Sequence, residues 1–391
     1  MNKKLLHTEV QHFIDANLKT DLPTLVLKGS DFEGISIQDL AQQVLSKSKC
    51  HTKLPTWFQT EKVYYPKAVN IEQTSSEITA HYKSTLISGQ SLIDLTGGFG
   101  VDAYFFAKRF DLVTHCEIDK ELSEIVTYNF GLMGVKNIDC KNVDGVSFIQ
   151  NATSHYDWIY IDPSRRNDLK KKVFRLEDCL PDVGLHLGDF LKHSNNIMIK
   201  LSPFLDIAST INSLQFVKEV QVVAVKNEVK ELIVLIQKGY KGVCQLKAVN
   251  ITKDKKDVFE GIFPSQEVSS FSLARKYLFE PNSAILKSGL FNEVSAQLNL
   301  YKLHINSHLY TSDVLIDFPG RSFEIIGVCK YNKKQIKRNF GSKKANITTR
   351  NFHDSVAEIR KKTGIKEGGD DFLFFTTDIE DKAIMIQCKK V

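Results

Sequence analysis

Residues 92–100, Leu-Ile-Asp-Leu-Thr-Gly-Gly-Phe-Gly, combine a short apolar segment, a carboxylate and a glycine-rich turn. Glycines in such a turn let backbone N–H groups approach a ligand closely at the start of a helix. Asp94 is the unusual member, because a loop that only holds a pyrophosphate would not place an anion four residues before its central glycine. A loop that holds a ligand with a cationic amino group would. Together with the acidic residues at the ends of later apolar segments, this loop indicates a nucleotide-like ligand that also carries an amino acid.

Further acidic residues follow later apolar segments. Glu117 ends the second segment, Asp144 follows the third, and Asp162 and Pro163 follow the fourth. Ligands of open α/β sheets bind at the carboxyl ends of the strands, so we expect these side chains to lie at one edge. There Asp94 would face the amino group, Glu117 would accept the ribose hydroxyl protons and Asp144 would accept an adenine N–H. Each carboxylate taken alone could equally cap a helix.

Strand and helix patterns alternate through this part of the chain, which is typical of parallel βαβ units in a doubly wound sheet. We expect strands at 91–95, 112–117, 137–140, 158–161 and 196–201. We expect helices at 100–109, 120–131, 145–150 and 176–191. Residues 220–236 instead predict two strands joined by a turn near Asn227, so an antiparallel hairpin closes the sheet.

Residues 75–237 resemble the class I S-adenosylmethionine-dependent methyltransferases, whose Rossmann-like α/β sheet is also closed by a hairpin. The resemblance implies S-adenosyl-L-methionine as the cofactor. It implies a cofactor site made of Asp94, Thr96, Gly98, Gly100, Glu117 and Asp144. Thr96 departs from the pattern, because it stands where the usual loop has its first glycine.

Asp162 and Pro163 match the first two positions of the Asp-Pro-Pro-aromatic motif of enzymes that methylate amines in nucleic acids. The resemblance implies that this carboxylate and the next backbone carbonyl hold the target amine, so that catalysis is mainly orientation. Ser164 and Arg165 replace the second proline and the aromatic residue. Arg165 or Arg166 could stack on a base or hold a phosphate, and could equally form salt bridges. A carbon target would need a cysteine near this loop, and Cys179 is expected within a helix.

The flanking regions differ from this central domain. Residues 1–85 predict a helical N-terminal region, with Ser36 capping one helix and residues 74–77 (Thr-Ser-Ser-Glu) forming a capping box. Residues 277–290 and the later residues 343–350 resemble the small ferredoxin-like and THUMP-like α+β modules of bacterial methyltransferases, and THUMP-type modules deliver structured RNA. We therefore expect four parts, which are 1–85, a methyltransferase domain at 86–272, and modules at 273–316 and 317–391.

The positive charge of the chain is concentrated in the last of these parts. Residues 317–391 contain 16 Lys and Arg against 10 Asp and Glu, and the remaining residues are balanced. Tyr331, Phe340 and Phe352 lie among the basic residues, and basic side chains with aromatic neighbours suit phosphate contacts and base stacking. Lys343 and Lys344 are candidate RNA contacts. The alternative is a solvated face of a small domain.

These features predict a methyltransferase that modifies an amine or other nitrogen of a base in structured RNA, either tRNA or rRNA. One alternative is a non-catalytic RNA-binding protein that keeps the fold. Another is an NAD-dependent oxidoreductase, because residues 98–103 also fit Gly-x-Gly-x-x-Ala. The seven scattered cysteines suggest reduced thiols, and their spacing predicts no metal site. Without a long apolar run or a signal peptide, we expect no membrane contact and a cytoplasmic location.

Overall fold

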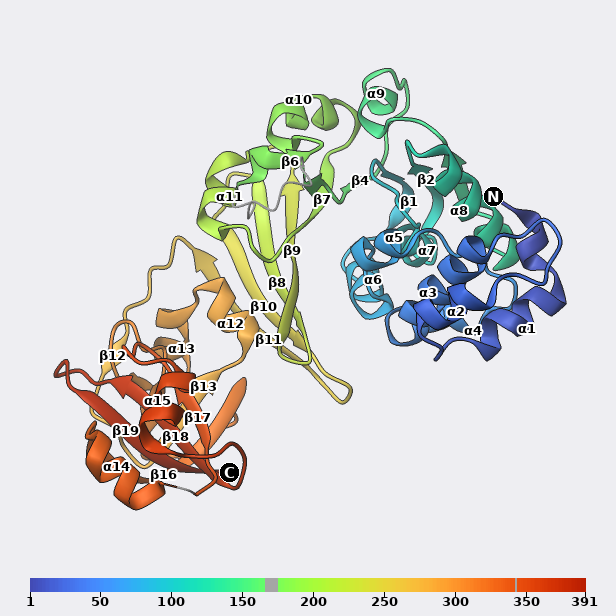
Figure 1. Ribbon diagram of the computed structural model, residues 1–391. Coiled ribbons are helices and arrows are strands. Elements are labelled where there is room, and N and C mark those ends of the chain that lie inside the picture. The colour runs from blue at the N-terminus through green and yellow to red at the C-terminus, as the bar shows by residue number, and fades with distance from the viewer. Residues whose placement is uncertain (166–174, 342) are drawn as a thin grey trace. The chain divides into compact units, whose positions relative to one another are not determined.

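The computed structural model describes residues 1–165, 175–341 and 343–391 (Figure 1). The chain divides into two compact units. The first contains residues 1–217 and 233–241, and the second contains residues 218–232 and 242–391. None of the helices in these described parts combines the length and the apolar character that crossing a bilayer requires.

The first unit is built on five parallel strands in the order β7-β4-β1-β2-β3. They are β1 (Gly89–Asp94), β2 (Phe110–Cys116), β3 (Ile138–Lys141), β4 (Trp158–Ile161) and β7 (Asn196–Leu201). The helices between and after them are α7 (Val101–Phe106), α8 (Lys120–Leu132), α9 (Gly145–Gln150), α10 (Val183–His193) and α11 (Ile207–Ser213). The central strands are apolar and buried, as strands covered on both faces must be. The predicted doubly wound sheet is confirmed.

The helix expected at 176–191 is wrong in its first half. Residues Leu176–Asp178 form a short 3-10 turn, and Cys179–Leu180 form β6, which pairs with β5 (Ser164–Arg165). Pro181 follows, and proline lacks the N–H that a helix interior requires. The helix begins only at Val183, where the Asp182 carboxylate accepts a hydrogen bond from the backbone N–H of Leu185 at 3.1 Å. Cys179 is therefore a buried strand residue and not a helical one.

The N-terminal region is helical, as predicted, and in Figure 1 its blue helices gather beside α7 and α8. They are η1 (Lys3–Leu6), α1 (Thr8–Ala16), α2 (Leu22–Lys28), α3 (Ile37–Lys53), α4 (Pro55–Gln59), α5 (Ala68–Gln73) and α6 (Glu77–Ser84). Asn129 of α8 joins them to the sheet domain, because its side-chain amide bonds both the N–H and the C=O of Tyr64, at 3.0 and 2.9 Å. These helices and the parallel sheet therefore form one compact unit.

The two capping predictions for this region have different outcomes. Ser36 caps α3 as expected, since its side chain accepts from the Asp39 N–H. The capping box from Thr74 is wrong, because Ser76 is the cap of α6 and accepts from Thr79. The Glu77 carboxylate instead accepts from the N–H and the hydroxyl of Thr56, at 2.6 and 2.7 Å. It thereby satisfies a free N–H group in the first turn of α4.

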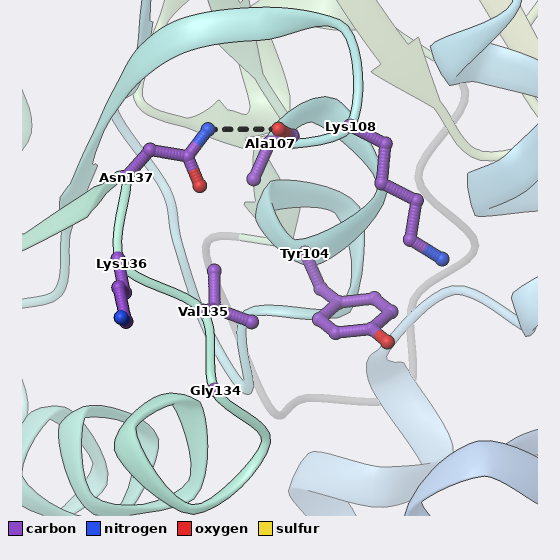
Figure 2. A pocket seen from close by; sticks show the side chains of 7 residues that line it. All are labelled: Tyr104, Ala107, Lys108, Gly134, Val135, Lys136 and Asn137. Atoms are coloured by element: carbon purple, nitrogen blue, oxygen red, sulfur yellow. Dashed lines mark hydrogen bonds between the residues drawn. The ribbon is translucent and has the colours of Figure 1, made fainter.

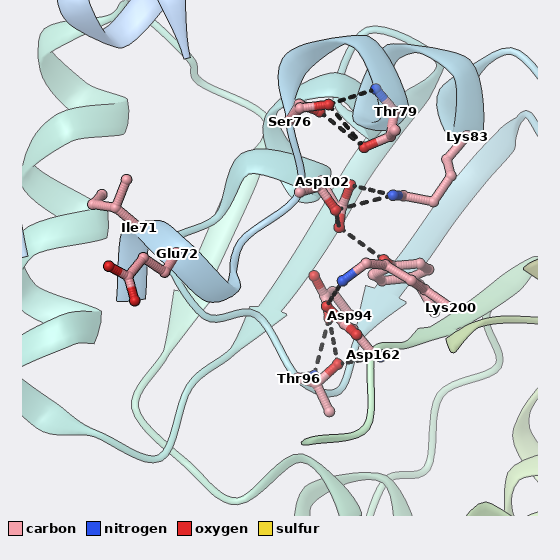
Figure 3. Close-up of polar contacts among 12 residues, drawn as sticks. Ile71, Glu72, Ser76, Thr79, Lys83, Asp94, Thr96, Asp102, Asp162 and Lys200 are labelled. Atoms are coloured by element: carbon pink, nitrogen blue, oxygen red, sulfur yellow. Dashed lines mark hydrogen bonds and ion pairs between the residues drawn. The ribbon is translucent and has the colours of Figure 1, made fainter. Parts of the chain in front are cut away.

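A buried ionic network holds α6 and α7 to β4. The Lys83 ammonium lies 3.2 Å from one oxygen of Asp102, and the other oxygen accepts from Ser75 and Tyr160 at 2.8 and 2.7 Å (Figure 3). Burial alone would raise the pKa of Asp102, but Lys83 and Lys200 with these hydrogen bonds hold it below its usual value. The carboxylate is therefore ionised, with one oxygen held by two hydrogen bonds and the other by the charge of Lys83.

The hairpin predicted at 220–236 is confirmed. Strands β8 (Val217–Val225) and β9 (Glu228–Gln237) are neighbours in the sheet and are joined by only Lys226 and Asn227. Both joining residues have positive φ, of 51° and 63°, which is the requirement of a type I′ hairpin turn. With β10 (Cys244–Ile251) and β11 (Lys256–Phe263), the whole sheet has the order β11-β10-β8-β9-β7-β4-β1-β2-β3.

The C-terminal part of the second unit contains an eight-stranded sheet with the order β12-β14-β15-β13-β16-β19-β18-β17. Its strands are β12 (Ser270–Phe271), β13 (Tyr277–Pro281), β14 (Tyr301–Lys302), β15 (Tyr310–Ser312), β16 (Gly320–Lys330), β17 (Asn346–Thr349), β18 (Asp371–Thr377) and β19 (Ala383–Lys390). Its helices are α12 (Ser283–Ser288), α13 (Phe291–Gln297), α14 (Lys333–Phe340) and α15 (Val356–Thr363). One sheet thus runs through both of the small modules expected here.

The buried network gives a prediction for stability. Replacing Lys83 by Met leaves the Asp102 carboxylate buried without its nearest cation, so we expect the free energy of unfolding to fall by about 3–5 kcal/mol. Chemical denaturation measures this change. Lys192→Met is the control, because Lys192 and Asp189 form an exposed pair and its loss is expected to cost less than about 1 kcal/mol. Equal losses in the two variants would contradict the prediction.

Candidate active site at the carboxyl ends of the strands

The glycine-rich loop after β1 has the backbone conformation that its sequence predicts. Gly98 and Gly100 have φ values of +55° and +76°, in the left-handed region that favours glycine. Gly100 also precedes the first residue of α7, and a Cβ there would lie 2.6 Å from the ring of Phe130. The loop therefore requires glycine at these positions, for conformation at both and for space at Gly100.

Gly97 is fixed by a residue that the sequence analysis missed. A Cβ at Gly97 would lie 2.2 Å from Nε2 of His115, whose ring is fully buried beneath the loop. Burial lowers the pKa of His115 to about 4, so the ring is neutral at physiological pH. Its only sequence signal is its position within an apolar strand, where a buried histidine is not predictable from spacing.

Asp94 lies at the tip of β1 and is almost completely buried. Its carboxylate accepts the backbone N–H of Thr96 at 2.9 Å, and no salt bridge joins it to a cation among the described residues. Burial raises its pKa well above the usual value, and the neighbouring carboxylates of Asp102 and Asp162 add to this. The loop thus contains a buried acid whose charge the described protein does not pair.

Thr96 explains the missing first glycine of the loop. Its hydroxyl accepts the backbone N–H of Asp162 at 2.7 Å, and its own N–H bonds Asp94. A glycine here could make the second contact but not the first. The side chain therefore ties the tip of β1 to the loop after β4.

Glu117 follows β2 and is joined directly to the glycine loop. One carboxylate oxygen accepts the Gly98 N–H at 2.9 Å, and the other accepts the Asp119 N–H at 2.7 Å. Burial raises its pKa, and these two hydrogen bonds oppose that rise. The structure therefore brings Asp94, Gly98 and Glu117 to one edge of the sheet, as the sequence predicts.

Asp144 acts as a helix cap, which is the alternative to ligand binding for an acid at the end of a strand. It caps α9, accepting the N–H and the hydroxyl of Ser147 at 3.1 and 2.6 Å. The hydrogen bond from the Ser147 hydroxyl lowers the pKa of this exposed carboxylate. The contact between Asp144 and adenine therefore stays a prediction.

Asp162 and Pro163 follow β4 at the same edge. The Asp162 carboxylate forms an ion pair with Lys200 at the carboxyl end of β7, which Figure 3 shows beside Asp94 and Thr96. Sequence analysis missed Lys200. The sequence places Lys200 near the end of a predicted strand. Its ion pair with Asp162 could not be predicted, because it depends on which strand lies next to β4.

Of the two arginines expected to contact substrate near this loop, the structure describes the backbone of Arg165. Arg165 is the second residue of β5, and its backbone lies opposite Cys179. Arg166 lies outside the described residues. The strand pairing brings the backbone of Cys179 near the loop that carries Asp162, and the cysteine side chain is buried.

A cavity of about 390 Å³ lies elsewhere in the first unit, between the end of α7 and the loop before β3 (Figure 2). It is lined by Tyr104, Ala107, Lys108, Gly134, Val135, Lys136 and Asn137. None of the residues predicted for the cofactor or the acceptor lines it. No group of three or more His, Cys, Asp or Glu side chains in the described ranges could hold a metal ion.

The basic C-terminal segment is organised differently from the prediction. Phe340 belongs to a buried core, and the partly buried rings of Tyr331 and Phe352 pack against it, so all three rings contribute to the core of the domain. Arg321 and Arg350 both pair with the buried carboxylate of Glu280. On α14 only Ile336 and Phe340 are buried, and its basic residues are Lys333, Lys334, Lys337 and Arg338. Lys343 and Lys344 are exposed beyond that helix.

The unpaired acid gives a prediction about pH. The folded-state pKa of Asp94 is raised, so its favourable contribution exists at low pH and is lost as pH rises through that pKa. Asp94→Asn is therefore expected to raise the free energy of unfolding at pH 8 by at least about 1.4 kcal/mol, the value of one pKa unit, and by less at pH 5.

Denaturation at both pH values measures the effect, and Asp144→Asn is the matched control. The pKa of Asp144 is lowered, so its contribution is present above the unfolded value and the substitution should destabilise at pH 8. An Asp94→Asn variant that is no more stable than the parent at pH 8 would refute the assignment.

Comparisons with known proteins agree with this geometry. A crystal structure from Porphyromonas gingivalis W83, of a protein assigned as a methyltransferase, matches 100% of this chain and 99% of its own at 28% identity, with a TM-score of 0.86. Uncharacterized S-adenosylmethionine-dependent methyltransferases from two strains of Mycobacterium tuberculosis are 19% identical over 68% of this chain and 71% of theirs. Residues 277–319 match a ferredoxin-like domain, and residues 320–390 match the THUMP domain-like family. The chain is thus homologous to S-adenosylmethionine-dependent methyltransferases, and its C-terminal part matches ferredoxin-like and THUMP-like domains.

Proposed function

We propose that the protein transfers a methyl group from S-adenosylmethionine to a nitrogen of a base in structured RNA, either tRNA or rRNA. The observation that carries the proposal is the asymmetry of two carboxylates at adjacent strand tips. Asp94 is buried without a cation partner, and Asp162 is paired with Lys200. A site with this charge distribution fits a cationic cofactor beside a neutral acceptor.

The residues at the sheet edge fit the cofactor. Asp94 offers a buried carboxyl group, and a cationic ammonium or sulfonium group beside it would favour its ionised form. Glu117 presents a carboxylate for ribose hydroxyls, fixed by the Gly98 N–H. Gly98 and Gly100 let the backbone pass close to the ligand, and Asp144 remains the proposed contact for adenine. When bound, S-adenosylmethionine supplies an activated methyl group whose transfer discharges the sulfonium.

Asp162 is the proposed catalytic residue, with the backbone carbonyl of Pro163. Together they would accept the N–H groups of the target amine and orient its lone pair for in-line attack. As the nitrogen–carbon bond forms, the amine loses a proton, and the Asp162 carboxylate is placed to receive it. Thr96 holds the backbone of Asp162 during this step.

The THUMP-like domain supports RNA as the substrate, together with the charge of its surface. Arg321 and Arg350 both form ion pairs with Glu280, which offsets one of their two positive charges, so most of the basic excess lies elsewhere in the domain. We propose that Lys333, Lys334, Lys337 and Arg338 of α14, with Lys343 and Lys344, bind RNA phosphates. Such contacts are electrostatic and need no aromatic platform.

A non-catalytic RNA-binding protein remains the second candidate, and the replacement of the second proline and the aromatic residue by Ser164 and Arg165 favours it. Incubation of the purified chain with tritiated S-adenosylmethionine and total RNA from cells lacking the gene separates the two. Incorporation of label into RNA supports the enzyme, and its absence supports the binding protein. Mass spectrometry of the nucleosides then identifies the modified position.

Substitutions at the site are expected to separate cofactor binding from transfer. Asp94→Ala and Glu117→Ala each remove a charged partner, so calorimetry should show cofactor affinity falling by about 10–100-fold. Asp162→Ala should keep the affinity and lose about 100-fold or more in transfer rate. Asp139→Ala, an exposed acid on β3, is the control. Unchanged affinity in both cofactor variants would rule out the site.

The proposed RNA surface gives a prediction about salt. The double substitution Lys334→Glu and Lys337→Glu on α14 is expected to weaken binding of total tRNA and to reduce the slope of log affinity against log salt by about 1.5. Fluorescence anisotropy over a salt series measures both effects. Lys382→Glu with Lys389→Glu is the control in the same domain, because these lysines already pair with Glu380 and Asp371. Equal loss in both double variants would argue against α14.

A further inference from the structure

Lys200 lies where the strand register brings it beside the proposed catalytic carboxylate. Ile161 of β4 pairs with Ile199 of β7. The residues that follow them, Asp162 and Lys200, are therefore neighbours across the two strands. Their side chains form an ion pair between Lys200 Nζ and Asp162 Oδ2 (Figure 3). The side chains are 14% and 29% exposed, so the pair is accessible from one side and not sealed in the core.

The two oxygens of Asp162 are therefore not equivalent. Oδ2 accepts from Lys200, and the backbone N–H of Asp162 is held by the Thr96 hydroxyl at 2.7 Å. Among the described residues no hydrogen bond is recorded to Oδ1. The residue is thus fixed at two points, and one carboxylate oxygen is left for another donor.

Lys200 also gives the two carboxylates different electrostatic surroundings, because it forms an ion pair with Asp162. A cationic cofactor entering this edge would meet both Asp94 and Asp162, which influence each other electrostatically. Because Lys200 neutralises Asp162, the cofactor's positive charge is attracted to Asp94. Asp162 then remains available to a neutral N–H donor.

We propose that Lys200 is a positioning residue of the acceptor site, which holds Asp162 so that Oδ1 receives the N–H of the target amine. The inference rests on the proposed function. During transfer the carbon–sulfur bond breaks, the nitrogen–carbon bond forms, and the proton of the amine passes to Oδ1 and then to solvent. Lys200 remains an ammonium throughout and exchanges no proton.

A contribution to stability alone does not account for this pair. The side chains of Lys200 and Asp162 are 14% and 29% exposed, so solvent screens their charges more than it does in a fully buried pair. The buried Lys83–Asp102 pair has the opposite character, with Lys83 fully buried and Asp102 bonded to two further hydroxyl groups. Loss of Lys200 should therefore affect the reaction more than the fold.

The test compares Lys200→Met, Lys200→Arg, Asp162→Asn and the double variant Lys200→Met with Asp162→Asn. Tritiated S-adenosylmethionine and total RNA from cells lacking the gene give kcat and KM, calorimetry gives cofactor affinity, and thermal denaturation reports folding. Lys192→Met is the control for loss of one positive charge, since it lies in α10 and pairs with exposed Asp189.

We expect Lys200→Met to lower kcat by about 100-fold while it remains folded and its cofactor affinity matches that of Lys192→Met. Lys200→Arg should recover most of the rate, because it restores a cation. The double variant should be no slower than Asp162→Asn alone, since Lys200 acts through that carboxylate.

Three results would overturn the inference. Full activity in Lys200→Met would show that Asp162 needs no partner, and multiplicative losses in the double variant would show that Lys200 acts independently. A wild-type chain that binds the cofactor but labels no RNA refutes the proposed function, and the inference fails with it. Active wild-type protein with an equally active Lys200→Met variant refutes only the inference.

Discussion

The site depends on a continuous set of hydrogen bonds between strand tips. Thr96 accepts from the backbone of Asp162 and donates its own N–H to Asp94, and the Gly98 N–H bonds Glu117. The tips of β1, β2 and β4 are thereby fixed to one another at the edge where parallel sheets bind ligands. Because each bond joins a side chain to a backbone group, the loop conformation and the carboxylate positions are set together. His115 beneath Gly97 supports the same loop from below.

Much of the parallel sheet could be predicted from the sequence, because each strand is a short apolar run that ends in an acid, a glycine or a proline. The strands at 158–161 and 196–201 have the predicted bounds, and the others in the parallel sheet differ by one or two residues at each end. The helix predicted from 176 begins only after Pro181, because proline cannot donate the backbone hydrogen bond that a helix interior requires. The role of Glu77 was also not predictable from local sequence, because its hydrogen-bond partner Thr56 lies in another helix.

Contacts between distant segments were the part that sequence could not supply. Glu280 forms ion pairs with Arg321 and Arg350. The local count of basic residues therefore overstates how many basic side chains are available to bind phosphates. The three aromatic rings near the basic residues have an apolar spacing that suits a core as well as a surface, and the core uses them. Composition therefore located the charged domain, and only the contacts within it point to α14.

Asp94 and Asp162 show how one fold gives the same residue type two chemical properties. They follow neighbouring strands, and β7 places Lys200 in an ion pair with Asp162. The unpaired acid destabilises the protein without a ligand, because burial opposes its ionisation. A cationic ligand relieves that cost when it binds, so part of its affinity comes from the unfavourable state of the empty site. The paired acid has no such affinity for cations, which keeps its free oxygen for a neutral acceptor. In the proposed mechanism, the position of Lys200 therefore assigns Asp94 to the cofactor and Asp162 to the acceptor.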